Sequence, residues 1–344
     1  MSDTTPIKAV DFFCGAGGMT RGFLDAGIEV LAGVDNDCRL RQTYETNNSP
    51  SRFVCADVRN LDFEELRDHL RLGKRDLLLY AACTPCQPFS SLNRAAKDDD
   101  RKDLLLVFGE IVKSHPPDLI VVENVPGLHH AYGREIHQKF LDQIRSVGFD
   151  EVFTDCLDAA DYSVPQTRKR FIMITSRLGK ARKPSRSSKP RTVRDAIAHY
   201  PLLRHGGSDG HHFNHAARRL MDHHLVIVRA IPKDGGSRAD VTDESILLKC
   251  HREKPKVHKD VFGRMAWGKP APTLTGRCTD VYCGRFVHPD QDRGISLREA
   301  ASLQTFPDDY EFFGTFFHIA QQIGNAVPVR FAKKLGQAAR LSVR

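Results

Sequence analysis

The sequence of 344 residues contains no apolar run long enough to cross a lipid bilayer, and it contains no internal repeat. Its first residues, MSDTTPIKAVDFF, lack the basic and then apolar order of a signal peptide. The nine cysteines are an odd number and follow no disulfide framework. These absences predict a cytoplasmic protein that does not bind a membrane. Because the cytoplasm is reducing, we expect all the cysteines to be free thiols.

A metal-binding pattern is also missing. Histidines occur as adjacent pairs and the later cysteines stand alone, so neither group has the ligand spacing of a structural zinc site. The residues concerned are His129, His130, His211, His212, His223, His224, Cys250, Cys278 and Cys283. We therefore expect no bound metal.

What the sequence does have is the composition of an ordinary globular protein with excess positive charge. Hydrophobic residues make up 40% of the chain and charged residues 27%, and the formal net charge is +8. A chain of this length exceeds one typical hydrophobic core, which predicts two domains or one large domain with an insertion. The positive charge is compatible with a polyanionic partner without requiring one.

This positive charge is concentrated between Arg177 and Arg194. The segment contains eight lysines and arginines, no acidic residue, three serines and two prolines. Such a composition is typical of a solvated linker. It also suits a flexible crossing beside a phosphate backbone, where each cation adds affinity by releasing counterions. The two interpretations are compatible with each other.

Short apolar runs alternate with helical patterns in the amino-terminal half. Runs rich in β-branched or large apolar residues lie at 7–13, 29–35, 52–57, 76–83, 118–125 and 170–176. Helical stretches such as 18–27 and 101–115 separate several of them. This alternation predicts an α/β fold with a doubly wound, mostly parallel sheet, in which ligands bind beyond the carboxyl ends of the strands.

A glycine-rich turn follows the first predicted strand. In DFFCGAGGMTRGF, the residues Gly15, Gly17 and Gly18 lie between a strand and a helix, where they allow a tight turn and a close approach of a ligand. The dinucleotide fingerprint G-x-G-x-x-G is absent. Asp35 and Asp57 end the second and third strands. A carboxylate there can bind ribose or an adenine amino group, or it can cap a helix.

Reactive residue types follow the later strands. The fourth strand leads into TPCQPFS, where Cys86 stands between two prolines, although a lone cysteine is more often a small buried residue. The fifth strand ends with Glu123, a carboxylate that is costly to bury unless it is paired or used. Arg168 and Arg170 lead into the sixth strand and share one face if the segment is extended. Their convergence at one edge of the sheet predicts an active site.

Six segments, in this order, resemble the DNA (cytosine-5)-methyltransferase family of the single-chain bacterial and archaeal type. They are the glycine turn at 11–23, PCQ at 85–87, ENV at 123–125, QTRKR at 166–170, RMAWGKPAPTLTGR at 264–277 and QQIGNAVPV at 321–329. The resemblance extends over nearly the whole chain. It implies a Rossmann-like methyltransferase fold. It also implies transfer of a methyl group from S-adenosylmethionine to C5 of cytosine in a specific double-stranded DNA sequence, with S-adenosylhomocysteine as product.

The resemblance also implies a cofactor pocket. In the family the glycine turn binds the cofactor, the acid after the second strand holds the ribose, and the residues after the third strand contact the adenine. Carried over, the implied cofactor residues are Phe13, Cys14, Gly15, Gly17, Gly18, Asp35, Asn36, Asp57, Val58, Pro85, Leu104, Asn325 and Val327. The last two lie far along the chain, so this segment is implied to return to the first domain.

The implied chemistry explains the catalytic residue types. Attack of the Cys86 thiolate on C6 of cytosine makes C5 nucleophilic enough to take a methyl group. Glu123, protonated or sharing a proton with N3, is implied to stabilise charge on the ring, with Arg168 bracing the base and the carboxylate and Arg170 in support. Because C5 and C6 are stacked inside a duplex, the cytosine must be flipped out. The segment 91–103 is expected to close over it.

The resemblance divides the chain into two domains. Residues 1–178 and 319–344 are expected to form the catalytic and cofactor-binding domain, and residues 179–318 a smaller, irregular target recognition domain. We expect a monomer that acts on the nucleoid of a prokaryote. A cognate restriction or defence system is compatible with the sequence, which does not name the recognised bases.

Other classes of function fit less well. The RNA-directed branch of the same family carries a Cys-Phe-Thr tripeptide that is absent here. A silent DNA-binding protein on this fold would be free to lose Cys86, Glu123 and Arg168, which are intact. An oxidoreductase would need the missing dinucleotide fingerprint. Two positions depart from the family pattern, because Thr84 stands where proline is common and Asn93 where glycine is commoner.

Overall fold

The computed structural model describes residues 5–70, 72–85, 103–129, 133–254 and 257–343. The chain divides into two compact units. Unit 1 comprises Met1–Tyr162, Lys169–Arg186 and Val327–Arg344, and unit 2 comprises Ser163–Arg168 and Ser187–Ala326. No helix in these described ranges has the length and apolarity needed to span a membrane.

The bounds of the two units differ from the predicted domain bounds. Residues 163–168 and 319–326 belong to unit 2, and residues 179–186 belong to unit 1. The first difference arises because Gln166 forms a parallel bridge with Ala271, which draws this segment into unit 2. The division into a catalytic and a recognition domain stays a prediction.

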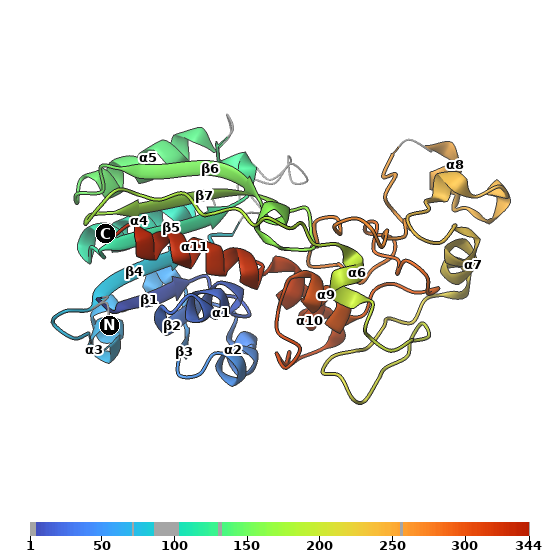
Figure 1. The fold of residues 1–344 in the computed structure, drawn as a ribbon, viewed down its shortest axis with the longest axis horizontal. Coiled ribbons are helices and arrows are strands. Elements are labelled where there is room, and N and C mark those ends of the chain that lie inside the picture. The colour runs from blue at the N-terminus through green and yellow to red at the C-terminus, as the bar shows by residue number, and fades with distance from the viewer. Residues whose placement is uncertain (1–4, 71, 86–102, 130–132, 255–256, 344) are drawn as a thin grey trace. The chain divides into compact units, whose positions relative to one another are not determined.

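In its described residues, unit 1 is built on a seven-stranded sheet with the order β3-β2-β1-β4-β5-β7-β6 (Figure 1). The strands β1 to β5 pair in parallel, whereas β7 is antiparallel to both of its neighbours. The predicted doubly wound, mostly parallel α/β sheet is therefore confirmed. The strands are β1 (Ile7–Phe12), β2 (Glu29–Asp35), β3 (Arg52–Cys55), β4 (Leu77–Ala82), β5 (Leu119–Asn124), β6 (Val152–Asp158) and β7 (Lys169–Ser176).

Helices cover both faces of this sheet (Figure 1). The helices α3, α4 and α5 bury one face, in a core that includes Phe12, Tyr80 and Phe108. The helices α1 and α11 pack against each other, and α11 also contacts β5 and β7. The helices of unit 1 are α1 (Gly18–Asp25), α2 (Arg41–Asn47), α3 (Phe63–Leu70), α4 (Leu104–Ser114), α5 (Arg134–Arg145) and α11 (Val329–Leu341).

The contact between α1 and α11 returns the end of the chain to its beginning. Gly22 of α1 faces α11 so closely that a Cβ atom there would lie 2.4 Å from Cβ of Ala332 and 2.6 Å from the carbonyl oxygen of Val329. Only glycine permits this approach. Pro328 is the amino-terminal cap residue of α11.

Unit 2 has no sheet in its described residues, only isolated β-bridges. Buried arginines donate hydrogen bonds to main-chain carbonyl groups in this unit. Arg264 is fully buried and donates hydrogen bonds to the carbonyl oxygens of Val228, Ile231, His288 and Gln291. The helices of unit 2 are α6 (Val193–Ile197), α7 (Asp222–Ala230), α8 (Lys249–Glu253), α9 (Leu297–Leu303) and α10 (Phe316–Asn325).

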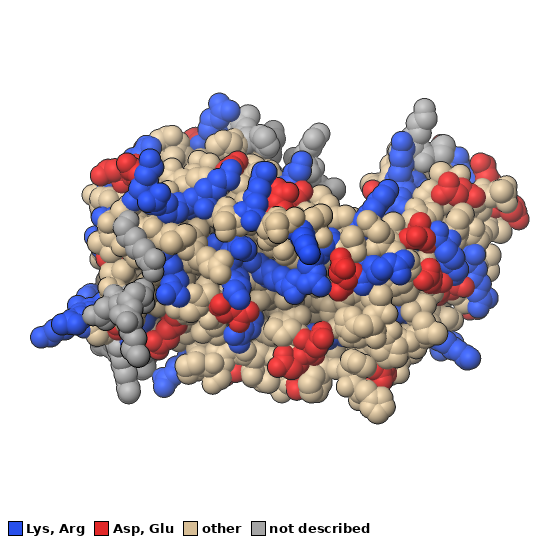
Figure 2. Space-filling model, viewed as in Figure 1, with Lys and Arg blue, Asp and Glu red and all other residues tan. Residues whose placement is uncertain are grey.

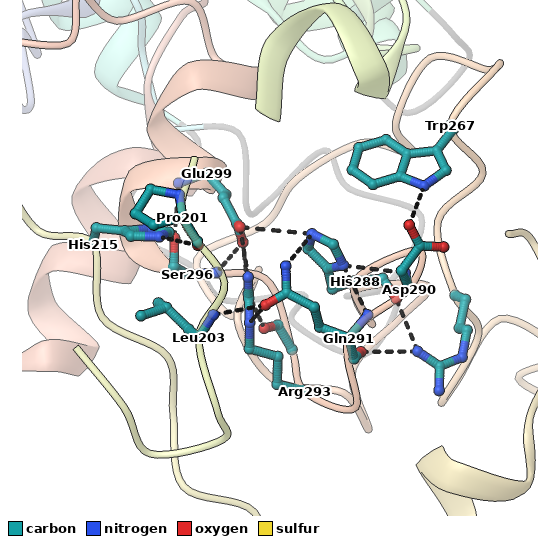
Figure 3. Close-up of polar contacts among 12 residues, drawn as sticks. Pro201, Leu203, His215, Trp267, His288, Asp290, Gln291, Arg293, Ser296 and Glu299 are labelled. Atoms are coloured by element: carbon teal, nitrogen blue, oxygen red, sulfur yellow. Dashed lines mark hydrogen bonds and ion pairs between the residues drawn. The ribbon is translucent and has the colours of Figure 1, made fainter. Parts of the chain in front are cut away.

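Buried polar groups around the start of α9 form a second network in unit 2 (Figure 3). Arg293 donates to both carboxylate oxygens of Glu299, each at 2.7 Å, and both residues are buried. Ser296 and Glu299 form a capping box at the start of α9. His215 contacts Ser296 at 2.9 Å between Nδ1 and Oγ, and its Nε2 lies 3.1 Å from the carbonyl oxygen of Pro201.

The prediction that all cysteines are free thiols is wrong for one pair, because Cys38 and Cys55 form a disulfide. Parallel pairing of β2 and β3 places Cys55 opposite Asp35, three residues before Cys38. The Cα atoms of the two cysteines are 5.2 Å apart across a sequence separation of 17. Their proximity comes from strand register, which the cysteine spacing alone does not show.

Part of the basic segment is bound to unit 1. The Nζ atom of Lys183 lies 2.8 Å from Oδ2 of Asp155, and Nη2 of Arg186 lies 3.4 Å from Oδ2 of Asp161. The main-chain N–H of Arg182 donates to Oγ of Ser342 at 2.9 Å. Residues 182–186 are therefore packed against unit 1, which moves the unit boundary beyond the predicted residue 178.

Candidate active site

The turn after β1 presents open main chain at the start of α1. Phe13, Gly15 and Gly17 have φ angles of 59°, 55° and 85°, a backbone region that glycine occupies without strain. A Cβ atom at Gly15 would meet no atom within 4 Å. The turn therefore leaves room for a ligand beside Gly15, and Gly17 caps α1 with its backbone alone.

The Asp35 carboxylate braces this turn. Its Oδ2 accepts a hydrogen bond from the main-chain N–H of Gly15 at 2.9 Å, and its Oδ1 accepts from that of Asp37 at 3.0 Å. Burial raises the pKa of Asp35 above its ordinary value. Asp57, at the end of the neighbouring strand β3, accepts from the main-chain N–H of Arg59 at 2.9 Å. The sequence left open ligand binding or capping for both acids, and both have main-chain roles in the structure.

A buried hydrogen-bond chain that sequence reasoning missed lies behind the turn. Oγ1 of Thr20 donates to Oδ2 of Asp11 at 2.7 Å, and the hydroxyl of Tyr44 lies 2.9 Å from Oγ1 of Thr20 and 2.8 Å from Oγ of Ser51. Burial raises the pKa of Asp11 to about 7. The only signal in the sequence was a charged residue, Asp11, inside an apolar strand. The hydrogen bonds fix α1 and α2 relative to β1.

The residues that precede Cys86 in the chain are held by a contact with β5. Nδ2 of Asn124, at the end of β5, donates to Oγ1 of Thr84 at 2.7 Å and to its carbonyl oxygen at 3.2 Å. Thr84 is buried and Pro85 is half-buried. The threonine that departs from the family pattern thus supplies an acceptor that proline lacks. Cys86 and most of the predicted closing segment 91–103, including Asn93, lie outside the described residues.

Glu123 forms an ion pair with Arg170 at the carboxyl edge of the sheet. The Nε atom of Arg170 lies 2.8 Å from Oε1 of Glu123, and the two side chains are 12% and 9% exposed. Glu123 lies at the end of β5 and Arg170 near the start of β7, which is the adjacent strand. The ion pair neutralises the charge of the largely buried carboxylate, which keeps some contact with solvent.

Arg168 is buried and contacts main-chain carbonyl groups of unit 2. Its guanidinium donates to the carbonyl oxygen of Leu274 at 2.8 Å and to that of Gly324 at 3.2 Å, within unit 2. Among the described residues Glu123 pairs with Arg170, and the bracing role assigned to Arg168 stays a prediction. The two arginines diverge because β7 begins only at Lys169, and residues 163–168 follow the structure of unit 2.

Arg168 is nevertheless a meeting point for three of the six sequence motifs. Gln166 accepts from the main-chain N–H of Leu274 at 2.9 Å, and its own amide donates to Oε1 of Gln304 at 2.9 Å. Gly324 lies so close to this region that a Cβ atom there would come within 1.9 Å of the carbonyl oxygen of Thr275. QTRKR, PTLTGR and QQIGN therefore depend on one another for their conformation.

Sequence and structure comparisons agree with this geometry. The family model for C-5 cytosine-specific DNA methylases matches residues 7–340. The chain belongs to the C-5 cytosine-specific DNA methylase family. The Type II methylase M.HgiDII of Herpetosiphon aurantiacus is 36% identical over 338 residues, which cover 96% of this chain and 94% of that protein. The Type II methyltransferase M1.HphI of Haemophilus parahaemolyticus is 31% identical over 96% of this chain and 86% of its own length.

Solved structures share the fold of this methylase. A prophage-encoded E. coli protein superposes with a TM-score of 0.71 and 24% identity over 98% of this chain and 99% of that chain. The methyltransferase EhMeth of Entamoeba histolytica gives a TM-score of 0.66 at 12% identity, over 98% of this chain and 99% of its own. The Rossmann-like methyltransferase fold implied by the sequence motifs is confirmed. The enzyme is a DNA (cytosine-5)-methyltransferase.

The structure brings most of the predicted site residues of the methylase to one edge of the sheet. The glycine turn, Asp35, Asp57, Pro85 and Glu123 all follow or end neighbouring strands of unit 1. Asn36 is exposed beside Asp35, whereas Val58 and Leu104 are buried in the core beneath the edge. Val327 is buried in unit 1, and Asn325 is the exposed last residue of α10 in unit 2.

Two buried cysteines and one buried histidine of the methylase have shifted pKa values. Burial raises the pKa of Cys14, and burial raises the pKa of Cys278 to about 12, so neither thiol ionises readily. Burial lowers the pKa of His288 to about 4, which keeps it neutral in the network of Figure 3. Among the residues that the structure describes, no group of three or more His, Cys, Asp or Glu side chains could hold a metal ion.

Proposed function

We propose that this methylase transfers the methyl group of S-adenosylmethionine to C5 of a cytosine flipped out of a specific duplex DNA sequence, with Cys86 as the attacking nucleophile. The observation that carries the proposal is the Glu123–Arg170 ion pair at the carboxyl edge of the sheet. It lies at the end of β5, the neighbour of the strand that leads through Thr84 and Pro85 to Cys86. A carboxylate, a cation and a cysteine at one edge are the groups this chemistry needs.

The residues of unit 1 fit the proposed methyl donor. Gly15 has open space beside it and main-chain groups of the turn face the start of α1. Asp35 is held in place by two main-chain donors, and each of its oxygens can accept a further hydrogen bond from a ribose hydroxyl. The rest of the proposed cofactor pocket would consist of Phe13, Cys14, Gly17, Gly18, Asn36, Asp57, Val58, Pro85 and Leu104. Asn325 and Val327, near the end of the chain, would also contribute. When bound, the donor supplies an electrophilic methyl group on a sulfonium.

Cys86 would begin the reaction. Its thiolate forms a bond to C6 of the cytosine, which moves electron density to C5 so that C5 can accept the methyl group. Loss of the C5 proton, to a water molecule, then restores the C5–C6 double bond, and the thiolate leaves. Atoms and charge balance because one proton is released for each methyl group gained.

Glu123 would hold the pyrimidine while this happens. Sharing a proton with N3 withdraws charge from the ring as the thiolate adds, and it distinguishes cytosine from uracil, whose N3 already carries a hydrogen. Arg170 keeps the carboxylate in place through its Nε atom, and its remaining N–H groups can turn toward the base. Arg168 would act indirectly, by holding Leu274 and Gly324.

DNA binding would use both units. We propose that unit 1 is the catalytic and cofactor-binding domain and that unit 2 is the target recognition domain. Positive side chains gather over α11 on the face shown in Figure 2, and this helix contains Arg330, Lys333, Lys334 and Arg340 but no acid. Cations of this kind bind phosphates without reading sequence.

The proposal is tested by methyl transfer to duplex DNA with the purified chain and S-adenosylmethionine. Cys86→Ala is expected to abolish transfer because it removes the thiolate that adds to C6, while DNA binding is retained. Cys156→Ala, which changes an exposed cysteine of β6, is the matched control and should keep full activity. Transfer by Cys86→Ala at the normal rate would refute the mechanism, and transfer to RNA in place of DNA would refute the substrate.

DNA that contains 5-fluorocytosine at the target gives a second test. Fluorine at C5 cannot leave as a proton, so the final elimination is blocked and a denaturation-resistant adduct with Cys86 should accumulate. Peptide mapping identifies the cysteine. An adduct at Cys83, the nearest described cysteine in sequence, would overturn the assignment.

A further inference from the structure

Asp280 of unit 2 is a buried carboxylate that holds two arginines. Its side chain is 1% exposed. Its Oδ2 accepts from Nε of Arg277 at 2.9 Å, and its Oδ1 accepts from Nη1 of Arg218. One cation is enough to neutralise a buried carboxylate. The cluster therefore keeps one positive charge beyond what its ion pair requires.

Aromatic rings hold both guanidinium groups further. Cζ of Arg218 lies 5.6 Å from the ring centre of Tyr282 and 4.6 Å from that of Phe317, and Cζ of Arg277 lies 5.4 Å from Tyr282. The Tyr282 hydroxyl accepts from Nη1 of Arg218 at 2.8 Å and from Nη2 of Arg277 at 3.4 Å. Because these side chains are ordered before a ligand arrives, less conformational entropy is lost when one binds.

Arg277 is the outer of the two arginines and keeps one donor edge open. Its side chain is 58% exposed, compared with 27% for Arg218. Asp280 occupies Nε and Tyr282 one N–H of Nη2. In the part of the chain that the structure describes, Nη1 and the second N–H of Nη2 have no hydrogen-bond partner. Two neighbouring donors of this kind match the N7 and O6 acceptors of guanine in the major groove.

We propose that Arg277 reads a guanine of the recognised DNA sequence through its two Nη groups, with Asp280, Arg218 and Tyr282 as positioning residues. The inference rests on the proposed function, because it requires duplex DNA as the substrate. A phosphate contact is the competing role. It needs only a positive charge, which lysine also supplies, whereas the paired guanine contact needs the planar fork of arginine.

The test compares the wild-type chain with Arg277→Lys and Arg277→Ala on a pool of duplexes randomised around a cytosine. Bound duplexes are sequenced, and methylated cytosines are mapped in parallel. The wild type should require guanine at one position, and both variants should lower that preference roughly tenfold to a hundredfold while keeping the others. Arg229→Ala, which removes an exposed arginine from α7, is the control and should leave every preference unchanged.

Several outcomes would overturn the inference. One is an unchanged sequence preference in Arg277→Ala. Another is a uniform loss of affinity that Arg277→Lys restores, with a salt dependence of binding that is lower by about one unit, which identifies a phosphate contact. If the Arg277 variants unfold at lower temperature than the wild type, Tyr282→Phe replaces them as the test. This variant keeps the aromatic ring but removes the hydroxyl that positions Arg277, so it should still weaken the guanine preference. Duplexes that are selectively bound through Arg277 but never methylated would contradict the proposed function and support the guanine contact.

Discussion

The two units satisfy their buried main-chain groups by different means. In unit 1, neighbouring strands pair along a seven-stranded sheet, and helices pack on its two faces. In unit 2 no sheet is present among the described residues, and its largest fully buried side chains are Arg264, Arg293 and Arg298. Arg298 donates to the carbonyl oxygens of Phe213, Pro307 and Tyr310. A unit of irregular loops thus depends on a few arginines for contacts that a sheet distributes over many residues.

The same contrast applies to buried acids. Asp11 of unit 1 is buried without a cation and accepts from Thr20, and its pKa rises because of burial. Glu299 of unit 2 is equally buried but receives two hydrogen bonds from Arg293. Burial alone would raise the pKa of Glu299, and the arginine outweighs it so that the pKa is lowered. The contributions of Asp11 and Glu299 to stability should therefore change with pH in opposite directions.

Arg264→Met should have the largest effect on stability. It removes the buried guanidinium that donates to four carbonyl oxygens and to Asp292, which we expect to cost about 3–5 kcal/mol of unfolding free energy. Urea denaturation measures the loss. Arg229→Met, at an exposed position of α7, should change stability by less than about 0.5 kcal/mol. Equal losses in the two variants would contradict the idea that buried arginines hold unit 2 together.

Gly22→Ala should have a smaller effect, in unit 1. Alanine favours helix more than glycine does, but its Cβ would overlap Ala332 and the carbonyl of Val329. We expect a net loss of about 1–3 kcal/mol from overpacking. Gly268→Ala is the control, because a Cβ there meets no atom within 4 Å. If Gly22→Ala raised the free energy of unfolding, the close α1–α11 contact would not require glycine at this position.

The pH dependence of stability should give the smallest change over any one pH unit. The folded-state pKa of Asp11 is about 7, above its ordinary value of 3.8, so its contribution is full below about pH 4 and is lost as pH rises to about 7. Asp11→Asn should remove this decline, whose slope is at most about 1.4 kcal/mol per pH unit. Denaturation between pH 4 and pH 8 measures it. A parallel decline in both proteins would show that Asp11 is not its source.

Glu299→Gln is the counterpart in unit 2. Because the folded-state pKa of Glu299 is lowered, its contribution is present above its ordinary value of 4.5 and is lost as pH falls below it. The variant should be less sensitive to acid than the wild type between pH 5 and pH 3. Loss of stability at rising pH in place of falling pH would contradict the assigned ion pair.

Much of the fold could be predicted because the strands of a parallel sheet are buried on both faces. Five of the predicted runs appear as β1 to β5, and 170–176 lies within β7. The strand β6 was missed because it lies at the sheet edge, and only Leu157 within it is buried. An edge strand needs no continuous apolar run, so VFTDCLD gives a weak signal.

The site was predicted less evenly. The glycine turn, Asp35 and Glu123 could be placed from their positions after strands, since strand ends of a parallel sheet meet at one edge. The pairing of Glu123 with Arg170 could not be predicted, because it depends on the residue at which β7 begins. The link between Asn124 and Thr84 also escaped prediction, since it joins the ends of two strands that are distant in the chain.

The sequence by itself determined most of the strands, the family and the residue types of the site, because apolar runs, glycines and short motifs are local properties. Only the tertiary structure decided which groups are partners. It paired Glu123 with Arg170, Cys38 with Cys55, and Asp280 with Arg218. Each of these contacts joins segments whose approach is set by strand register or by loop packing, and neither is encoded in the spacing of residues along the chain.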